Sequence, residues 1–282
     1  MNEVPFQLND LPRRFMLDVI RQFLDYSVAI VVYHPDDPSR VRIIGCGTLI
    51  SVGSTHGILT AHHVIHRSRP PIQLRSDSDQ IFALTISKKD LFRIPCSMLT
   101  EIEIGVPESD QDGPDLTFVQ LPNIKQLGTL KATKSFWPLD NPELTPPTYD
   151  FSNTLLCTLG SRQVHQDMVV SGNRVTLDIG MIGYCGVYEM AHEFSAGRFD
   201  YIDTVVNYEL GSKNLPQSFK GLSGGGLWAF RVSTPDHGKT FRIKDPFLSG
   251  VAFYQTERKD NIRKIRHHFV GSIYKEVLAS LS

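Results

Sequence analysis

The chain has 282 residues, of which 41% are hydrophobic and 21% charged, and its formal net charge at pH 7 is −1. This composition excludes a disordered chain and leaves enough apolar residues for a substantial core. A net charge near zero gives no overall field that would attract nucleic acid or anionic lipid. We therefore expect no nucleic-acid partner, and we interpret the basic cluster at 258–266 as a solvated face. No apolar run reaches the length of a membrane span, so no membrane association is expected either.

The first predicted element is a helix near the N-terminus. Asp10 can cap it, Pro12 fits its first turn, and apolar side chains recur at helical spacing opposite charged ones: Phe15, Val19, Ile20, Phe23 and Leu24. Its apolar face predicts packing against a β structure.

β-branched and apolar runs separated by turn residues then predict strands along most of the chain. In the first half these runs lie at 28–33, 42–51, 57–60, 81–86, 101–105 and 115–121. The proline-containing segment 122–152 predicts a connection. Runs in the second half lie at 154–159, 168–170, 174–182, 201–208, 226–232 and 247–254. A closing helix is expected from about 266 to 281.

Three segments carry side chains suited to nucleophilic catalysis: Thr60-Ala61-His62-His63-Val64, the Asp115–Leu121 run, and Gly221-Leu222-Ser223-Gly224-Gly225-Gly226. A serine among glycines can be approached by another backbone, and its amide can turn toward a bound carbonyl. The order His, Asp, Ser is the one that chymotrypsin-type proteases use.

With 248–255 as a fourth segment, the chain resembles the trypsin-like (chymotrypsin-fold) serine peptidases over roughly residues 27–255. Its style is nearest to bacterial HtrA-like peptidases, without a PDZ module. The resemblance implies an all-β fold of two six-stranded antiparallel β-barrels with an N-terminal and a C-terminal helix. The implied parts are an N-terminal helical extension at 1–26, a first barrel at 27–121, a linker at 122–152 and a second barrel with the C-terminal helix at 153–282.

The resemblance also implies roles for individual residues. Ser223 would be the nucleophile, His63 the general base and acid, and Asp115 the carboxylate that orients His63. The amides of Gly221 and Ser223 would form the oxyanion hole.

Other residues compete for two of these roles. His62 adjoins His63, Asp110 and Asp112 lie close to Asp115, and Asp115 itself could be only a turn residue. The apolar run after Asp115 favours the catalytic reading, because a carboxylate at the mouth of a buried strand is costly unless it is paired. For His62, and for His66, His267 and His268, we expect surface or hydrogen-bonded histidines.

The resemblance also implies substrate-binding residues: Gln217 at the base of the primary pocket, Gln255 along its wall, and Phe253 with Tyr254 along the cleft. None of them is acidic, so no trypsin-style preference for Lys or Arg is expected unless loop insertions bring Glu209 or Asp245 into the pocket.

Two positions depart from the family pattern. Leu222 stands where zymogen-activated relatives have an Asp, which argues against activation by N-terminal cleavage. Phe253 stands where many relatives have a Ser that supports the catalytic Asp, so Asp115 needs support from elsewhere.

The four cysteines, Cys46, Cys96, Cys157 and Cys185, are scattered and predict buried thiols. Without the disulfide of secreted relatives and without a leader sequence, a cytoplasmic protein is expected. We expect no Cys-x-x-Cys or His-x-x-x-His pair with the usual ligand spacing, and therefore no metal and no cofactor.

The expected partners are a protein or peptide substrate and, since such sites are also assembled on demand, an activating protein. Two rival functions use the same cleft. A pseudo-protease would hold a peptide strand without cleaving it, and an esterase would cleave small esters only.

Overall fold

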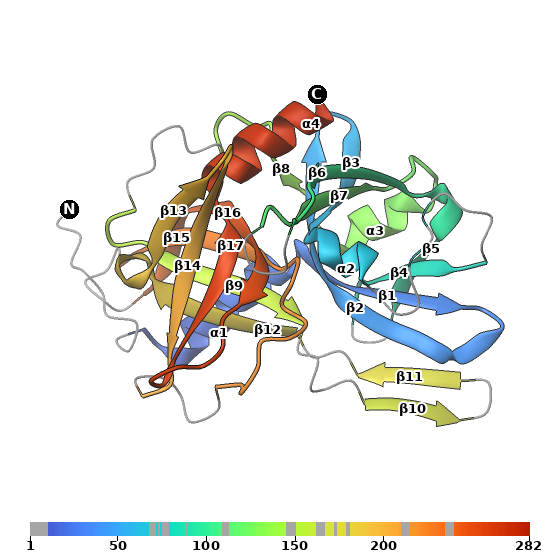
Figure 1. The fold of residues 1–282 in the computed structure, drawn as a ribbon, viewed down its shortest axis with the longest axis horizontal. Coiled ribbons are helices and arrows are strands. Elements are labelled where there is room, and N and C mark those ends of the chain that lie inside the picture. Colours follow the sequence, from blue (N-terminus) through green and yellow to red (C-terminus); the bar gives the residue numbers. More distant parts are fainter. Residues whose placement is uncertain are drawn as a thin grey trace.

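The computed structural model describes residues 11–67, 72, 74, 79–87, 90–108, 113–144, 151–161, 167–171, 174–178, 181–209, 215–234 and 240–282. About half of these residues lie in two antiparallel sheets, which occupy the two halves of the molecule, with a helix near each end of the described chain (Figure 1). The expected β-rich chain with an N-terminal and a C-terminal helix is confirmed to that extent. Asp10, Asp110 and Asp112 lie outside the described residues.

The first half contains helix α1 and the eight strands of the first sheet. In chain order the elements are α1 (Arg13–Leu24), β1 (Ser27–His34), β2 (Asp37–Val52), β3 (Thr55–Thr60), α2 (His62–His66), β4 (Ile81–Thr85), β5 (Leu91–Pro95), the short helix η2 (Cys96–Met98), β6 (Thr100–Gly105), β7 (Leu116–Gln120), α3 (Leu127–Thr133) and β8 (Trp137–Pro138). The strand order is β5-β4-β1-β2-β3-β7-β6, and β8 pairs in parallel with β2.

The second half contains a seven-stranded sheet, a two-stranded sheet and the C-terminal helix. Its elements are β9 (Leu155–Ser161), β10 (Asp167–Ser171), β11 (Arg174–Asp178), β12 (Met181–Val187), η4 (Tyr188–Met190), β13 (His192–Ala196), β14 (Phe199–Asn207), β15 (Gly226–Ser233), β16 (Arg242–Gln255), β17 (Ile262–His268), η5 (Ser272–Val277) and α4 (Leu278–Leu281). The strand order is β12-β9-β15-β16-β17-β14-β13, while β10 pairs only with β11.

The strand prediction is wrong in number and in two boundaries. Six strands were expected in each half, but the described residues contain eight in the first half and nine in the second. The strands β5, β8, β13 and β17 lack a long apolar run, and the predicted run at 174–182 covers two strands, β11 and β12. The basic cluster at 258–266 overlaps β17: its Arg and Lys side chains are exposed or half-buried, whereas Ile265 within it and His267 and His268 after it are buried. The C-terminal helix therefore begins after 268, and the connection at 122–152 contains helix α3 and strand β8.

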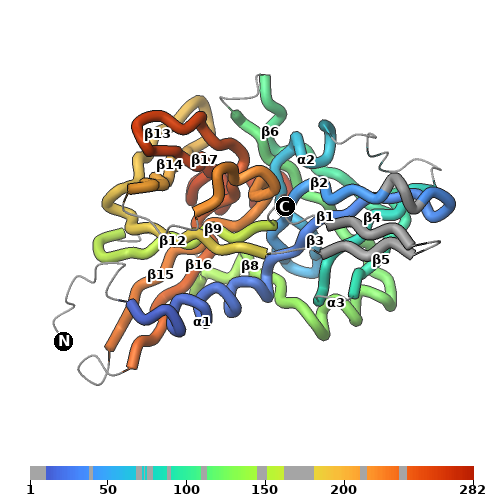
Figure 2. Tube along the Cα trace, turned by 90° about the horizontal axis from the view of Figure 1, so that it is seen from below, coloured from blue at the N-terminus to red at the C-terminus, as the bar shows by residue number. Residues whose placement is uncertain are grey.

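Helix α1 lies across the second sheet along β9 and β12, as Figure 2 shows. Its apolar spacing buries Val19 and Phe23, as the sequence predicts. The Phe23 ring stacks on Trp228 of β15 with ring centroids 4.8 Å apart. Trp137 of β8 meets the same Trp228 ring edge-on at 5.3 Å, so α1 and both sheets share one apolar core.

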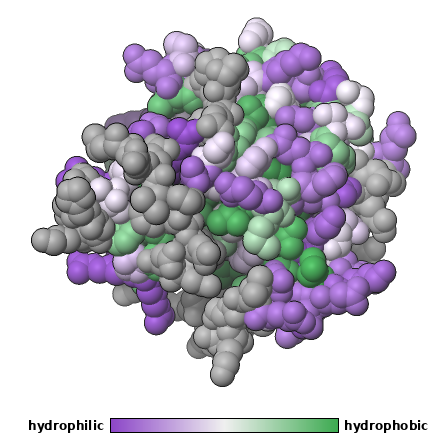
Figure 3. All heavy atoms as spheres, turned by 90° about the vertical axis from the view of Figure 1, so that its left-hand side faces the viewer, coloured by the Kyte–Doolittle hydropathy of each residue, from purple (hydrophilic) through white to green (hydrophobic). Residues whose placement is uncertain are grey.

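The outer surface is mixed. On the face that lies at the left of Figure 1, apolar side chains gather toward the middle and hydrophilic ones surround them (Figure 3). Among the described residues, no helix has the length and apolar character needed to cross a membrane.

The stacking of Phe23 on Trp228 predicts that α1 is a structural part of the core. We expect Phe23→Ala to lower the free energy of unfolding by about 3–5 kcal/mol, because it leaves a cavity between α1 and β15. Leu17→Ala on the same helix is the control, since Leu17 is 43% exposed, and should change stability by less than about 0.5 kcal/mol. Urea denaturation measures both, and equal losses would contradict this role of Phe23.

Candidate active site

Helix α2 places His63 at the edge of the first sheet. It begins directly after β3, whose last residue, Thr60, donates a 2.6 Å hydrogen bond to the carbonyl of Cys46 on β2. Val64 and Ile65 are buried and fix the helix on the core. The His63 side chain is 28% exposed and lines a pocket.

Asp115 lies immediately before β7 with its side chain only 6% exposed. Its Oδ2 accepts a 2.6 Å hydrogen bond from Nδ1 of His63, and its Oδ1 accepts one of 2.9 Å from the His63 amide. Burial raises the pKa of the Asp115 carboxyl, but the hydrogen bonds and charge of His63, helped by His268, outweigh burial and hold the pKa below its ordinary value. Asp115 is therefore ionised at neutral pH.

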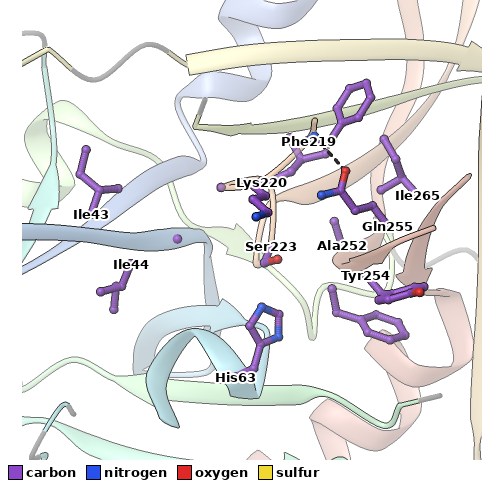
Figure 4. A pocket seen from close by; sticks show the side chains of 14 residues that line it. Ile43, Ile44, His63, Phe219, Lys220, Ser223, Ala252, Tyr254, Gln255 and Ile265 are labelled. Atoms are coloured by element: carbon purple, nitrogen blue, oxygen red, sulfur yellow. Dashed lines mark hydrogen bonds between the residues drawn. The ribbon is translucent and has the colours of Figure 1, made fainter. Parts of the chain in front are cut away.

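This contact fixes the tautomer of His63. An ionised carboxylate only accepts hydrogen bonds, so in the neutral form of the His63 imidazole Nδ1 carries the proton and Nε2 keeps its lone pair. In Figure 4 the imidazole extends toward Ser223, and both residues line the same pocket. No hydrogen bond joins the Ser223 hydroxyl to another described residue. General-base catalysis would need Nε2 of His63 within about 2.6–3.2 Å of this hydroxyl.

The turn that carries Ser223 is held against strand β2. Gly221 and Gly224 have φ angles of +93° and +85°, which favour glycine. The amide of Cys46 donates a 2.9 Å hydrogen bond to the Ser223 carbonyl, and the Cys46 thiol donates one of 3.0 Å to the Gly221 carbonyl. A Cβ on Gly224 would lie 1.9 Å from the Cys46 carbonyl oxygen, so only glycine allows this approach.

Two backbone donors remain free beside the hydroxyl. Within the described chain, the amides of Gly221 and Ser223 donate no hydrogen bond, whereas the next two amides of the turn do: Gly224 to Ala252, and Gly225 to Leu222. A pair of unused amides at a pocket can bind an oxyanion.

The pocket has a volume of about 400 Å³, and its lining mixes apolar side chains with polar ones, Lys220 among them. Phe253, Tyr254 and Gln255 line it, as the sequence predicts, together with Phe219, Ala252 and Ile265. None of its described lining residues is acidic. Glu209 accepts a hydrogen bond from Asn261, and Asp245 lies next to Lys244 on β16, so neither lines the pocket.

The structure places Gln217 outside this pocket. Its side chain is exposed, with Oε1 3.4 Å from an Arg258 nitrogen, and its carbonyl accepts a 2.6 Å hydrogen bond from Arg263. Gln255 takes the inner position instead: its Oε1 accepts a 2.8 Å hydrogen bond from the Phe219 amide. Arginines of the β16–β17 region therefore hold Gln217 at the surface.

His268 is a site residue that the sequence analysis missed. It is buried on β17, and its Nε2 accepts a 3.0 Å hydrogen bond from the Asp115 amide. The Phe253 ring packs on its imidazole with centroids 4.7 Å apart. His268 thus holds Asp115 through the hydrogen bond to its amide, and Phe253 packs against His268. No local pattern shows this, because 153 residues separate the partners.

The other histidines do not take the place of His63. His267 is buried and hydrogen-bonded to Thr158 at 2.9 Å. His62 and His66 stack on each other with ring centroids 3.9 Å apart and lie beside glutamates of β6.

Comparison with known proteins does not assign the chain to a family. No protein-family model matches it, and a search of curated proteins gave no match.

The two buried histidines of β17 predict a pH-dependent stability. Burial lowers the pKa of both His267 and His268 from 6.5 to about 4. Both are therefore neutral in the folded state, while the unfolded chain binds a proton at each below about pH 6.5. The free energy of unfolding should be highest above pH 6.5 and fall by a few kcal/mol in all between pH 6.5 and pH 4.

Urea denaturation from pH 7.5 to 4.5 measures this dependence. His267→Gln and His268→Gln, which remove the titrating groups, should each flatten the profile even if they lower stability at pH 7.5. An unchanged slope in both variants would contradict the assignment.

Proposed function

We propose that this chain is a serine endopeptidase of the trypsin-like, two-barrel type. The observation that carries the proposal is that His63 and Ser223, from distant segments, line one pocket, while Asp115 is hydrogen-bonded to His63 behind it. The order of the elements agrees with two barrels: the first sheet would carry His63 and Asp115, the second would carry Ser223, and the pocket lies between them.

The proposed reaction uses only side chains and amides of this chain. Nε2 of His63 takes the proton of the Ser223 hydroxyl while the Ser223 oxygen attacks the carbonyl carbon of the substrate. The buried Asp115 carboxylate stabilises the imidazolium that forms. The developing oxyanion is bound by the free amides of Gly221 and Ser223, each worth about 2.7–4 kcal/mol in known sites. His63 then gives its proton to the leaving amine, and water releases the acyl group from Ser223.

The contacts support a site that is assembled without N-terminal cleavage. Leu222 is buried and lies against Gly160 of β9, where it anchors the turn by apolar packing. The Cys46 thiol holds the same turn through Gly221 and also accepts a 2.7 Å hydrogen bond from the Ser161 amide. A turn held by a free thiol suits a reducing compartment, so we place the protein in the cytoplasm.

The proposed substrates are polypeptides cleaved after a neutral side chain. The wall formed by Phe219, Ala252 and Phe253 favours an apolar or uncharged residue, and the lining offers no described carboxylate that would pair with Lys or Arg.

Cleavage of a peptide library by the purified chain tests this function. We expect cleavage after neutral residues, a loss of turnover on the order of 10⁶-fold in Ser223→Ala and on the order of 10⁴-fold in Asp115→Asn, which fixes the wrong tautomer of His63. Ser54→Ala, at an exposed turn between β2 and β3, is the matched control and should cleave like the wild type. Cleavage that survives in Ser223→Ala would refute the proposal, and a strong preference for Lys or Arg would refute the assignment of the pocket.

A further inference from the structure

Two histidines and two glutamates converge on the side of α2 that faces β6, next to the proposed active site. His62 and His66 are four residues apart on α2, and Glu101 and Glu103 are two apart on one face of β6. One possible ligand atom from each residue lies within 4.8 Å of all the others. His62 and His66 form a His-x-x-x-His pair, so the expectation that no histidine pair has ligand spacing is wrong, and the two glutamates are distant in the chain.

The distances between these atoms suit a tetrahedral metal ion. Nε2 of His62 lies 3.5 Å from Oε1 of Glu103, and Nε2 of His66 lies 2.8 Å from Oε1 of Glu101 and 3.6 Å from Oε1 of Glu103. Bonds of about 2.0–2.1 Å around tetrahedral zinc place neighbouring ligands roughly 3.4 Å apart. An ion would replace the hydrogen bond between His66 and Glu101, and rotation of the stacked imidazoles of His62 and His66 would bring the four atoms around it.

A second observation points to a missing partner. Nε2 of His62 is buried, its side chain is only 10% exposed, and it has no hydrogen-bond partner among the described residues. It faces two carboxylates, and a cation between them would satisfy all three groups. Glu101 already accepts a 2.9 Å hydrogen bond from Thr117 of β7, the kind of outer contact that orients a metal ligand.

The exposure of the four side chains allows an ion to enter. Glu103 and His66 are 52% and 40% exposed, whereas Glu101 and His62 are 15% and 10% exposed. The group therefore has a buried side and an open side.

We propose that His62, His66, Glu101 and Glu103 form a binding site for one Zn²⁺ ion. Two imidazole nitrogens with two carboxylate oxygens favour zinc or a similar transition metal over Mg²⁺ and Ca²⁺, which prefer oxygen ligands alone. The ion is structural: it ties α2, which carries His63, to β6, the neighbour of the strand that begins after Asp115. Binding at this site does not depend on the proposed peptidase activity.

Titration of the full chain with Zn²⁺ against a chromophoric chelator tests the site. We expect one equivalent to bind and thermal stability to rise with it. Glu103→Gln, at a half-exposed position, should keep the fold and weaken binding at least tenfold, and His66→Asn should do the same. Co²⁺ in place of Zn²⁺ should give the strong visible absorption of a four-coordinate ion.

Two variants control for other binding sites. His192→Asn removes an exposed histidine of β13, and His63→Ala removes the imidazole that a metal in the active site would need; both should bind Zn²⁺ like the wild type. The proposal is wrong if no stoichiometric ion binds, or if binding survives in both Glu103→Gln and His66→Asn. It is equally wrong if binding is lost in His63→Ala, which would place the ion in the active site.

Discussion

The structure depends on one close contact, in which strand β2 of the first sheet meets the Ser223 turn that precedes β15 of the second. The Cys46 amide and thiol both donate to carbonyls of this turn, and Gly224 approaches the Cys46 carbonyl so closely that no side chain fits between them. Ser223 belongs to one half of the molecule and His63 to the other. Their common pocket exists because this contact sets the distance between the halves.

Asp115 connects the same halves by a second route. A carboxylate at this depth is unfavourable unless it is paired. In the first half, His63 forms a hydrogen bond with the Asp115 carboxylate. In the second half, His268 accepts a hydrogen bond from the Asp115 amide, and the Phe253 ring packs on the His268 imidazole. The orientation of His63 thus depends on a buried histidine, His268, which links the proposed chemistry to the stability of β17.

The sequence predicted the parts of the site that local patterns encode. Each of the three side chains of the candidate site stands in a recognisable local pattern. Ser223 lies in a glycine-rich segment, His63 follows a buried strand and Asp115 precedes one, so all three could be named from the sequence. Contacts between distant segments could not be predicted from the sequence. His268 lies in a segment rich in Arg and Lys that favours a solvated face, and its partner is 153 residues away. Gln217 is displaced by arginines whose positions no local pattern gives. The predicted number of strands was wrong for a related reason, because short charged strands form only where a neighbouring strand pairs with them.

The central claim is that the base and the free amides around Ser223 make this one hydroxyl unusually reactive. Intact mass measurement after incubation with a fluorophosphonate probe tests it most directly, since such probes modify only activated serines. The account predicts a single adduct that peptide mapping places on Ser223 and that heat denaturation before incubation prevents. An unmodified native chain would contradict the account and favour a fold that holds peptides without cleaving them.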